Sequence, residues 1–318
     1  MADSGTDSLA TGPRLANADA RPTALRGSPR EASGWPFVVP AVILLLALNI
    51  FPLVFSIVMS FSNVSTDNGL RLTSATLSQW GQLLHDGDFW SAMKFTIFLV
   101  VVAVSLEYVF GLTLALLLWR KIPGGRFFRI VFTIPMMIAP VAIGFIFRML
   151  FNEQYGPVDS ILRGLHLPNV LWLSDTTTAP WTVVIMDLWQ WTPLMFLLLL
   201  AGLQSVPEDA LEAARIDGAS GLRIVWNITL PLLAPISVMA YLLRMILAFS
   251  IFGEIYLLTG GGPGTATTSV TLFAYYQGFQ NFNLSYGSTI SLALLVFVTF
   301  LALTYLAATR ILLRRVAT

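Results

Sequence analysis

Three charged residues lie inside long apolar stretches of this sequence, where unpaired charges are rare. Arg244 is about twelve residues into a run that starts at Leu232, which is about 18 Å deep in a helix that rises 1.5 Å per residue. Asp187 and Glu107 lie in two other apolar runs. Two interpretations follow: an ion pair of Arg244 with Asp187 or Glu107 that fixes helix packing, or hydrogen bonds from Arg244 to the hydroxyls or phosphate of a solute.

Aromatic and polar side chains close to Asp187 could bind a sugar. An aromatic face stacks on the apolar side of a pyranose, and amide and hydroxyl groups pair with its hydroxyls. The alternative is that the tryptophans only fill space between helices. The candidates are Trp189, Gln190, Trp191 and Thr192, with Arg244 at a similar depth. Weaker candidates near the outer end of the next run are Ser250, Glu254 and Tyr256, although a glutamate in the position of Glu254 is more often a solvated residue at the mouth.

The sequence contains no motif for a reaction of its own. It has no G-x-x-x-x-G-K-[ST] phosphate loop, since the GGGPG segment at 260–264 lacks the lysine, and no H-E-x-x-H metal motif. Cysteine is absent, and the only histidines are His85 and His166, both in predicted outer loops. We therefore expect no enzyme, no catalytic residue, no metal site and no cofactor bound by this chain.

Composition identifies the chain as a membrane protein. Of its 318 residues 56% are hydrophobic and 11% are charged, against about a quarter charged in an average soluble domain, and the mean hydropathy is +0.76. The net charge of +1 points to no nucleic-acid partner. Membrane lipid is the expected surrounding.

Six apolar stretches are long enough to cross a bilayer about 30 Å thick as helices. They run approximately over 36–61, 92–119, 130–151, 181–203, 232–258 and 288–313. Their apolar residues are continuous and do not alternate, so they predict helices and not barrel strands. The expected fold class is an all-α membrane protein with six transmembrane helices.

The distribution of basic residues predicts the orientation, because positively charged loops stay in the cytoplasm. Of the 18 Lys and Arg residues, 13 fall before the first span, in the second and fourth loops or after the last span. Three fall on the other side and two inside spans. Both termini are therefore expected in the cytoplasm. Residues 1–34, which contain no aromatic residue, are expected to form a disordered cytoplasmic tail, followed by one six-span domain over 35–318.

The segment between the fourth and fifth predicted spans predicts a helical hairpin in a cytoplasmic loop. Ser205 stands three residues before Glu208, the spacing of a capping box, so a helix is expected to begin there and to run through EDALEAARI. Gly218 can adopt the positive φ of a sharp corner. A short second helix, GLRIVWNI, is expected to follow before Pro231 leads into the fifth span.

This hairpin resembles the signature loop of the permease subunits of binding-protein-dependent ABC importers, which reads E-A-A-x-x-D-G-A and, about eight residues later, I-x-L-P. The chain has every specified residue: Glu212, Ala213, Ala214, Asp217, Gly218, Ala219, Ile228, Leu230 and Pro231. The resemblance implies that the helix from Gly221 to Asn227, with Leu222, is a coupling helix that sits in a groove of an ATPase subunit. It also implies alternating access.

Two further stretches are similar to the carbohydrate-uptake branch of these permeases, the branch of the larger maltose-importer permease. They start at Trp189 and at Phe252, and the second contains a Thr-x-Gly-Gly-Pro element at 259–263. The resemblance implies a sugar permease in a bacterial inner membrane. Its implied partners are a second homologous permease subunit, two ATPase subunits that hold ATP and Mg²⁺, and an external sugar-binding protein or lipoprotein.

The alternative is an ion-gradient-driven secondary transporter or a channel subunit. Many secondary transporters are built from repeats, and no internal repeat is evident in this sequence. That alternative predicts uptake without an ATPase subunit.

Overall fold

The computed structural model describes residues 35–64, 75–119 and 124–316, and all regular structure in these ranges is helical. The tail predicted for residues 1–34 lies outside them. In chain order the elements are α1 (Trp35–Ser60), α2 (Ser78–His85), α3 (Gly87–Trp119), α4 (Gly125–Met137), α5 (Pro140–Leu150), α6 (Pro157–Gly164), α7 (Ala179–Gln204), α8 (Glu208–Ile216), α9 (Gly221–Ile224), the π-helical turn η2 (Val225–Thr229), α10 (Leu230–Ala248), α11 (Gly253–Leu258), α12 (Val270–Tyr275), the π-helical turn η3 (Tyr276–Gln280) and α13 (Leu284–Val316).

The chain divides into two compact units, one up to Phe51 and one from Pro52 onward. The first contains most of α1, whose segment Val38–Ser60 is long and apolar enough to cross a bilayer. The second contains the remaining helices and every residue considered below as a functional candidate.

Five helical segments of the described chain can each span a bilayer, and a bent pair makes a sixth crossing if it is counted as one. The five are Val38–Ser60, Gly87–Trp119, Ala179–Gln204, Gly221–Ala248 and Leu284–Arg310. The predicted all-α membrane fold is thereby confirmed.

The predicted third span is not one helix. Helices α4 and α5 meet at an angle of 95°, with Ile138 and Ala139 in extended conformation between them. Pro140 starts α5, and a proline disfavours the helical conformation of the residue before it while offering no amide hydrogen of its own. The prediction of one helix over 130–151 was wrong for this reason, whereas the bent pair as a whole can still count as the sixth span.

The predicted fifth span is wrong at its outer end. Helix α10 ends at Ala248, and α11 is a separate helix that begins at Gly253. The intervening residues 249–252 are mostly apolar, so hydropathy alone cannot distinguish this break from a continuous helix.

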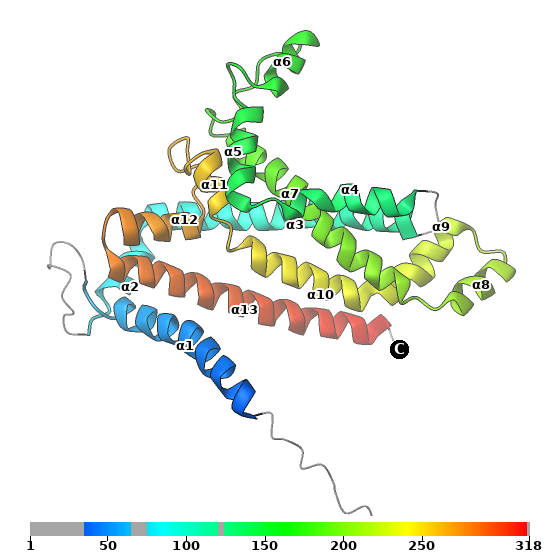
Figure 1. Ribbon diagram of the computed structural model, residues 1–318, viewed down its shortest axis with the longest axis horizontal. Helices are drawn as coiled ribbons and strands as arrows, with labels where there is room; N and C mark the ends of the chain where they lie inside the picture. The colour runs from blue at the N-terminus through cyan, green and yellow to red at the C-terminus, as the bar shows by residue number, and fades with distance from the viewer. Residues whose placement is uncertain (1–34, 65–74, 120–123, 317–318) are drawn as a thin grey trace, which may run out of the picture. The chain divides into compact units, whose positions relative to one another are not determined.

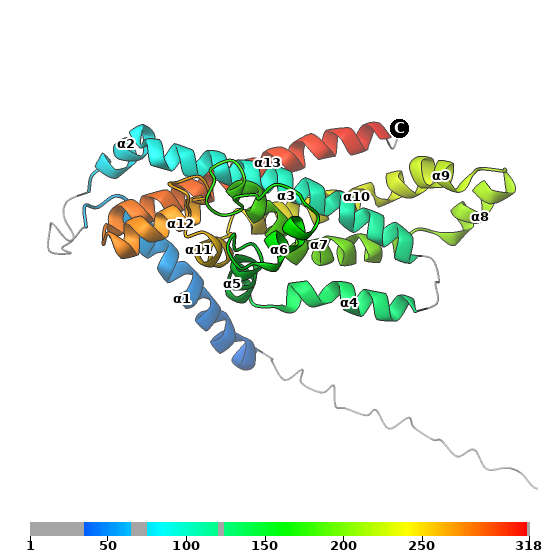
Figure 2. The same ribbon diagram turned by 90° about the horizontal axis from the view of Figure 1, so that it is seen from above.

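The second unit is held together by close packing of α3, α7, α10 and α13, which lie side by side (Figures 1 and 2). A Cβ atom on Gly111 of α3 would lie 2.9 Å from the backbone nitrogen of Phe196 on α7. Gly202 of α7 approaches Leu233 of α10 similarly, since an added Cβ would lie 2.6 Å from the leucine Cδ1. Small residues at such crossings let helix backbones approach, and this packing drives association in a bilayer.

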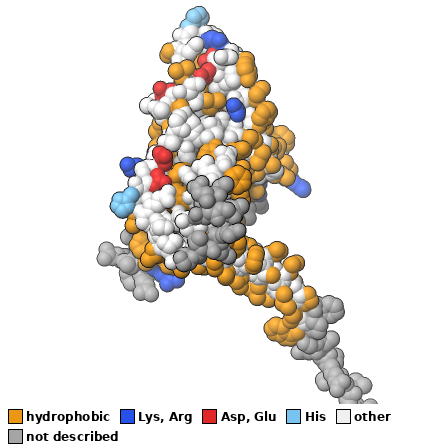
Figure 3. Space-filling view, turned by 90° about the vertical axis from the view of Figure 1, so that its left-hand side faces the viewer, with side chains coloured by type: hydrophobic (Ala, Val, Ile, Leu, Met, Phe, Trp, Pro, Cys, Tyr) orange, Lys and Arg blue, Asp and Glu red, His pale blue; other side chains and the backbone are white. Residues whose placement is uncertain are grey.

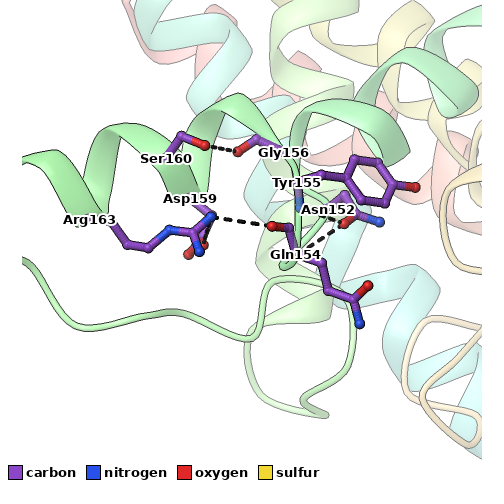
Figure 4. Close-up of polar contacts among 7 residues, drawn as sticks. All are labelled: Asn152, Gln154, Tyr155, Gly156, Asp159, Ser160 and Arg163. Carbon is purple, nitrogen blue, oxygen red and sulfur yellow. Dashed lines mark hydrogen bonds and ion pairs between the residues drawn. The ribbon is translucent and has the colours of Figure 1, made fainter.

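The connection between α5 and α7 is ordered by short-range polar contacts (Figure 4). The carboxamide oxygen of Asn152 accepts hydrogen bonds from the amides of Gln154 and Tyr155, at 3.0 and 3.2 Å. On α6, Arg163 forms an ion pair of 3.0 Å with the buried Asp159. Charged side chains gather at the α6 end of the face seen in Figure 3. This segment therefore presents both charged and apolar side chains at the far end of α5, since Ile161 and Leu165 are 62% and 64% exposed.

Candidate functional site

Arg244 on α10 forms ion pairs with both of its predicted partners. Its Nε lies 2.7 Å from Oε2 of Glu107 on α3, and its Nη2 lies 2.9 Å from Oε1 of the same carboxylate. The same Nη2 lies 2.5 Å from Oδ2 of Asp187 on α7. All three residues are at most 1% exposed. This cluster, which we call the buried triad, joins three helices inside the apolar bundle.

Trp191 covers one face of the Arg244 guanidinium. The arginine Cζ lies 5.1 Å from the centroid of the indole ring, within the range of a cation–π contact. Trp191 is one helical turn after Asp187 on α7, so both side chains point to the same side of the helix. The triad and the ring thus form one continuous surface.

A cavity of about 250 Å³ opens against this surface. It is lined by four of the eight predicted substrate residues, namely Trp191, Arg244, Ser250 and Glu254. Asp187 of the triad also lines it, as do residues that the sequence analysis did not select: Pro140, Leu247, Ile251, Phe252 and Gly253. Of these, Pro140 and Gly253 could have been noticed in the sequence, since proline and glycine commonly interrupt helices.

The cavity forms because two broken helices meet. One break precedes Pro140, and the other separates α10 from α11. Helices α5 and α11 pack so closely that a Cβ on Gly144 would clash with the carbonyl oxygen of Glu254. Membrane transporters often place ligand sites at such interruptions, because unwound backbone and buried polar groups are tolerated where they line a cavity.

The other four predicted residues lie away from the cavity. Trp189 points outward, 43% exposed, and its ring lies 5.6 Å from that of Phe147. The hydroxyl of Thr192 donates to the carbonyl of Leu188 within its own helix. Gln190 is buried, and its side-chain oxygen has no hydrogen-bond partner in the described structure. Tyr256 stacks on Phe252, with ring centroids 5.8 Å apart.

A second, larger cavity of about 680 Å³ shares Ser250 and Phe252 with the first. Its lining is mostly apolar and comes from the end of α10, from α12, η3 and α13, and from residues 52–56. No pattern in the sequence predicted this second cavity.

The predicted hairpin is formed by α8, a tight corner and α9. Gly218 has φ +76°, the left-handed conformation expected for it. The amide of Gly218 donates to the carbonyl of Arg215 and that of Ala219 to the carbonyl of Ala214, at 3.1 and 3.0 Å. Ser220 caps α9 by accepting a hydrogen bond from the amide of Arg223. The corner is thus fixed by hydrogen bonds at both ends.

Two details of the hairpin differ from the prediction. The capping box is not formed, because the hydroxyl of Ser205 donates to the carbonyl of Gly202 in the last turn of α7, and Pro207 occupies the N-cap of α8. The second helix does not end before Pro231. Helix α9 continues through η2 into α10, so Gly221–Ala248 is one helical segment.

The hairpin has a small core of its own and an exposed outer surface. Leu211, Ala214 and Ile224 are buried, and Trp119 from the end of α3 packs against them. Ala219, Ile228 and Leu230 of the signature are half-buried. The predicted coupling residues Glu212, Ala213, Asp217, Gly218, Gly221 and Leu222 are exposed. Three large apolar side chains are also exposed: Ile216 by 86%, Leu222 by 71% and Trp226 by 64%. An exposed apolar group of this kind is typical of a surface that binds another protein.

Comparison with known proteins identifies several similar permeases. A probable ABC transporter permease protein of Sinorhizobium fredii is 37% identical over 82% of this chain and 85% of its own length. The Trehalose/maltose transport system permease protein MalF of Thermococcus litoralis is 36% identical over 88% of this chain and 95% of that protein. The Trehalose transport system permease protein SugA of Mycobacterium tuberculosis is 34% identical over 85% and 86%.

The fold has a solved counterpart. A chain of a bacterial ABC transporter involved in the import of the acidic polysaccharide alginate superimposes with a TM-score of 0.74 at 19% identity, over 89% of this chain and 96% of that one. Residues 107–318 match the family described as binding-protein-dependent transport system inner membrane component. This chain is therefore a multi-pass membrane protein of that family, a permease subunit of a binding-protein-dependent ABC importer.

Proposed function

We propose that this chain forms half of the translocation pathway of an ATP-driven carbohydrate importer. A second homologous permease provides the other half, two ATPase subunits bind and hydrolyse ATP with Mg²⁺, and an external sugar-binding protein or lipoprotein delivers the cargo. Relatives named for trehalose and maltose support the sugar assignment. Trp191 and Ser250 in the cavity support it chemically, since an aromatic face and a hydroxyl suit a pyranose.

The observation that carries the proposal is the helical continuity from the hairpin to the cavity. Leu222 and Arg244 belong to one segment, Gly221–Ala248, and lie about 33 Å apart along it at 1.5 Å per residue. A displacement of α9 by an ATPase subunit is therefore transmitted along a single helix to the buried triad. We assign ATPase coupling to the exposed hairpin on this basis.

The mechanism is alternating access between two states. ATP closes the pair of ATPase subunits, α9 moves with its groove, and the bundle changes from an inward to an outward opening. Packed helix interfaces have few stable arrangements, so a small displacement at α9 is expected to switch the cavity between its two openings. The breaks at 138–139 and 249–252 are the points at which the cavity wall can bend.

The hairpin and both termini face the cytoplasm in this proposal, and the α6 segment faces outward. The basic residues of the sequence support that orientation. The external binding protein then meets the side of the permease on which α6 lies.

Reconstitution of the complete importer in liposomes tests the function. With ATP supplied on the hairpin side, we expect uptake of labelled maltose or trehalose and ATP hydrolysis stimulated by the loaded binding protein. Gly218→Val and Glu212→Ala should each reduce both readouts at least about tenfold, which corresponds to about 1.4 kcal/mol of lost coupling. Glu208→Gln, an exposed change on the same helix, serves as the control.

Two results would contradict the proposal. Uptake driven by an ion gradient in liposomes that lack an ATPase subunit would support the secondary transporter instead. Unchanged stimulation of ATP hydrolysis in both hairpin variants would refute the coupling assignment, whereas the sugar assignment depends on the uptake of the labelled cargo.

A further inference from the structure

The only arginine or lysine among the described residues that line the small cavity is Arg244, and its charge is already compensated. Glu107 and Asp187 both bind the guanidinium, and Trp191 covers one of its faces. No edge of the guanidinium is left for a bidentate contact with a carboxylate, sulfonate or phosphate group of a solute. Arg244 therefore offers an anionic solute no bidentate contact in this arrangement.

The other polar groups of the cavity are mainly acceptors. Asp187 lines the cavity, and its Oδ1 has no hydrogen-bond partner in the described structure, although the residue is only 1% exposed. Glu254 contributes a second carboxylate and is 6% exposed. Such oxygens require donors, and sugar hydroxyls provide them.

The formal charges around the cavity add to a negative value. Asp187 and Glu254 line the cavity beside Arg244, and Glu107 binds the guanidinium from outside the lining, so the four side chains carry a formal net charge of −2. A cleft whose lining carries a net charge, with walls of low dielectric constant, concentrates the electric field, so it repels solutes whose charge has the same sign.

We propose that this cavity accepts neutral polyhydroxylated solutes and excludes anionic ones, with Asp187 and Glu254 accepting hydrogen bonds from solute hydroxyls. The proposal rests on the proposed function and narrows it. Family membership alone leaves the charge of the cargo open, since relatives are named for trehalose and maltose and also for sulfoquinovosyl glycerol, by its name a sulfonated sugar derivative.

The fluorescence of Trp191 in the complete importer reports on the charge of the cavity. The chain has nine tryptophans, so the contribution of Trp191 is taken as the difference from a Trp191→Phe importer. We expect caesium to quench this difference at least about twofold more strongly than iodide, with neutral acrylamide as the access control. Glu254→Gln should make quenching by caesium and by iodide more nearly equal, whereas Glu208→Gln, the same charge change on exposed α8, should not.

A second measurement uses the absence of cysteine from the chain. A Ser250→Cys importer should react faster with a cationic methanethiosulfonate reagent than with an anionic one of similar size. Equal or faster iodide quenching, failure of acrylamide to reach Trp191, or a faster anionic reagent would each overturn the inference. ATP-dependent sugar uptake by the same preparation would show that the proposed function stands regardless.

Discussion

At Arg244, two carboxylates and one indole ring converge on a single guanidinium that is 1% exposed. A charge in this position is stabilised only by its partners, because it cannot be hydrated in the apolar interior. Removal of the arginine leaves two buried carboxylates without a counter-charge. The stability of the folded bundle is therefore expected to fall far more when one member of the triad is lost than when all three are replaced.

Arg244→Ala should lower the stability of the folded bundle by about 3–5 kcal/mol, the usual cost of breaking a buried ion pair. The thermal unfolding midpoint of the purified subunit in detergent measures this loss. Arg148→Ala, which removes an exposed arginine that donates to the Leu257 carbonyl, is the matched control and should change the midpoint little.

A triple variant distinguishes the triad from a simple packing effect. Arg244→Met combined with Glu107→Gln and Asp187→Asn removes all three charges at similar volume and should recover much of the lost stability. A triple variant less stable than Arg244→Ala would contradict this explanation of the triad.

The partners of Arg244 could be predicted from the sequence, but the detailed lining of the cavity could not. Pairing was predictable because few charges lie inside the apolar runs, and each must find an opposite charge. The four adjacent candidates from Trp189 to Thr192 could not be separated, because the rotation of α7 within the bundle decides which of them faces inward. Successive residues on a helix point about 100° apart, so only Trp191 reaches the cavity.

Among the helices, the contact of α5 with α11 determines the cavity most directly. Gly144→Ala places a Cβ against the carbonyl oxygen of Glu254, closer than nonbonded atoms can approach, so the two helices must separate. We expect a loss of about 1–3 kcal/mol in stability, measured by thermal unfolding, together with reduced sugar uptake. Gly164→Ala on α6 is the control, because its Cβ meets nothing within 4 Å, and equal effects of the two changes would argue against a special role for this contact.

The corner of the hairpin allows a conformational test. Gly218 has φ +76°, and a Cβ added there would meet no atom within 4 Å, so substitution costs backbone strain without a clash. Gly218→Ala should destabilise the hairpin by about 1–2 kcal/mol. Gly218→Asn should destabilise the hairpin less, because asparagine tolerates the left-handed region better than alanine. The rate of stimulated ATP hydrolysis should therefore decrease in the order Gly, Asn, Ala. The reverse order of Asn and Ala would contradict the conformational explanation.

The ends of a helix were predictable where the sequence carries a clear stop signal such as Gly218, and not where the helix boundary depends on packing. The range of α8 follows from the segment EDALEAARI, and the corner follows from Gly218. The break before Pro140 was not predictable, because prolines occur both at kinks and at breaks, and neighbouring helices decide between the two. The continuity of α9 with α10 was missed since Pro231 suggested a boundary, whereas the helix continues through this position, with the π-helical turn η2 directly before α10.

For the whole molecule, the orientation in the membrane is the property that links the cavity to its partners. Single-cysteine variants of this cysteine-free chain test it in intact cells. An impermeant maleimide added outside should label Tyr155→Cys, between α5 and α6, and should not label Leu222→Cys until the membrane is permeabilised. Both positions are well exposed, by 63% and 71%, so burial does not explain a difference. The opposite labelling pattern would invert the proposed topology.

The proposed transport cycle depends above all on the movement of α9 by a separate ATPase subunit. Crosslinking from Leu222→Cys in membranes that contain the whole importer measures this contact, with the Ser160→Cys variant on α6 as the comparison. We expect a crosslinked product of this chain with the ATPase subunit from Leu222→Cys alone, in a yield that changes when ATP is added. Absence of that product in an importer that still transports, or the same product from Ser160→Cys, would show that α9 is not the contact.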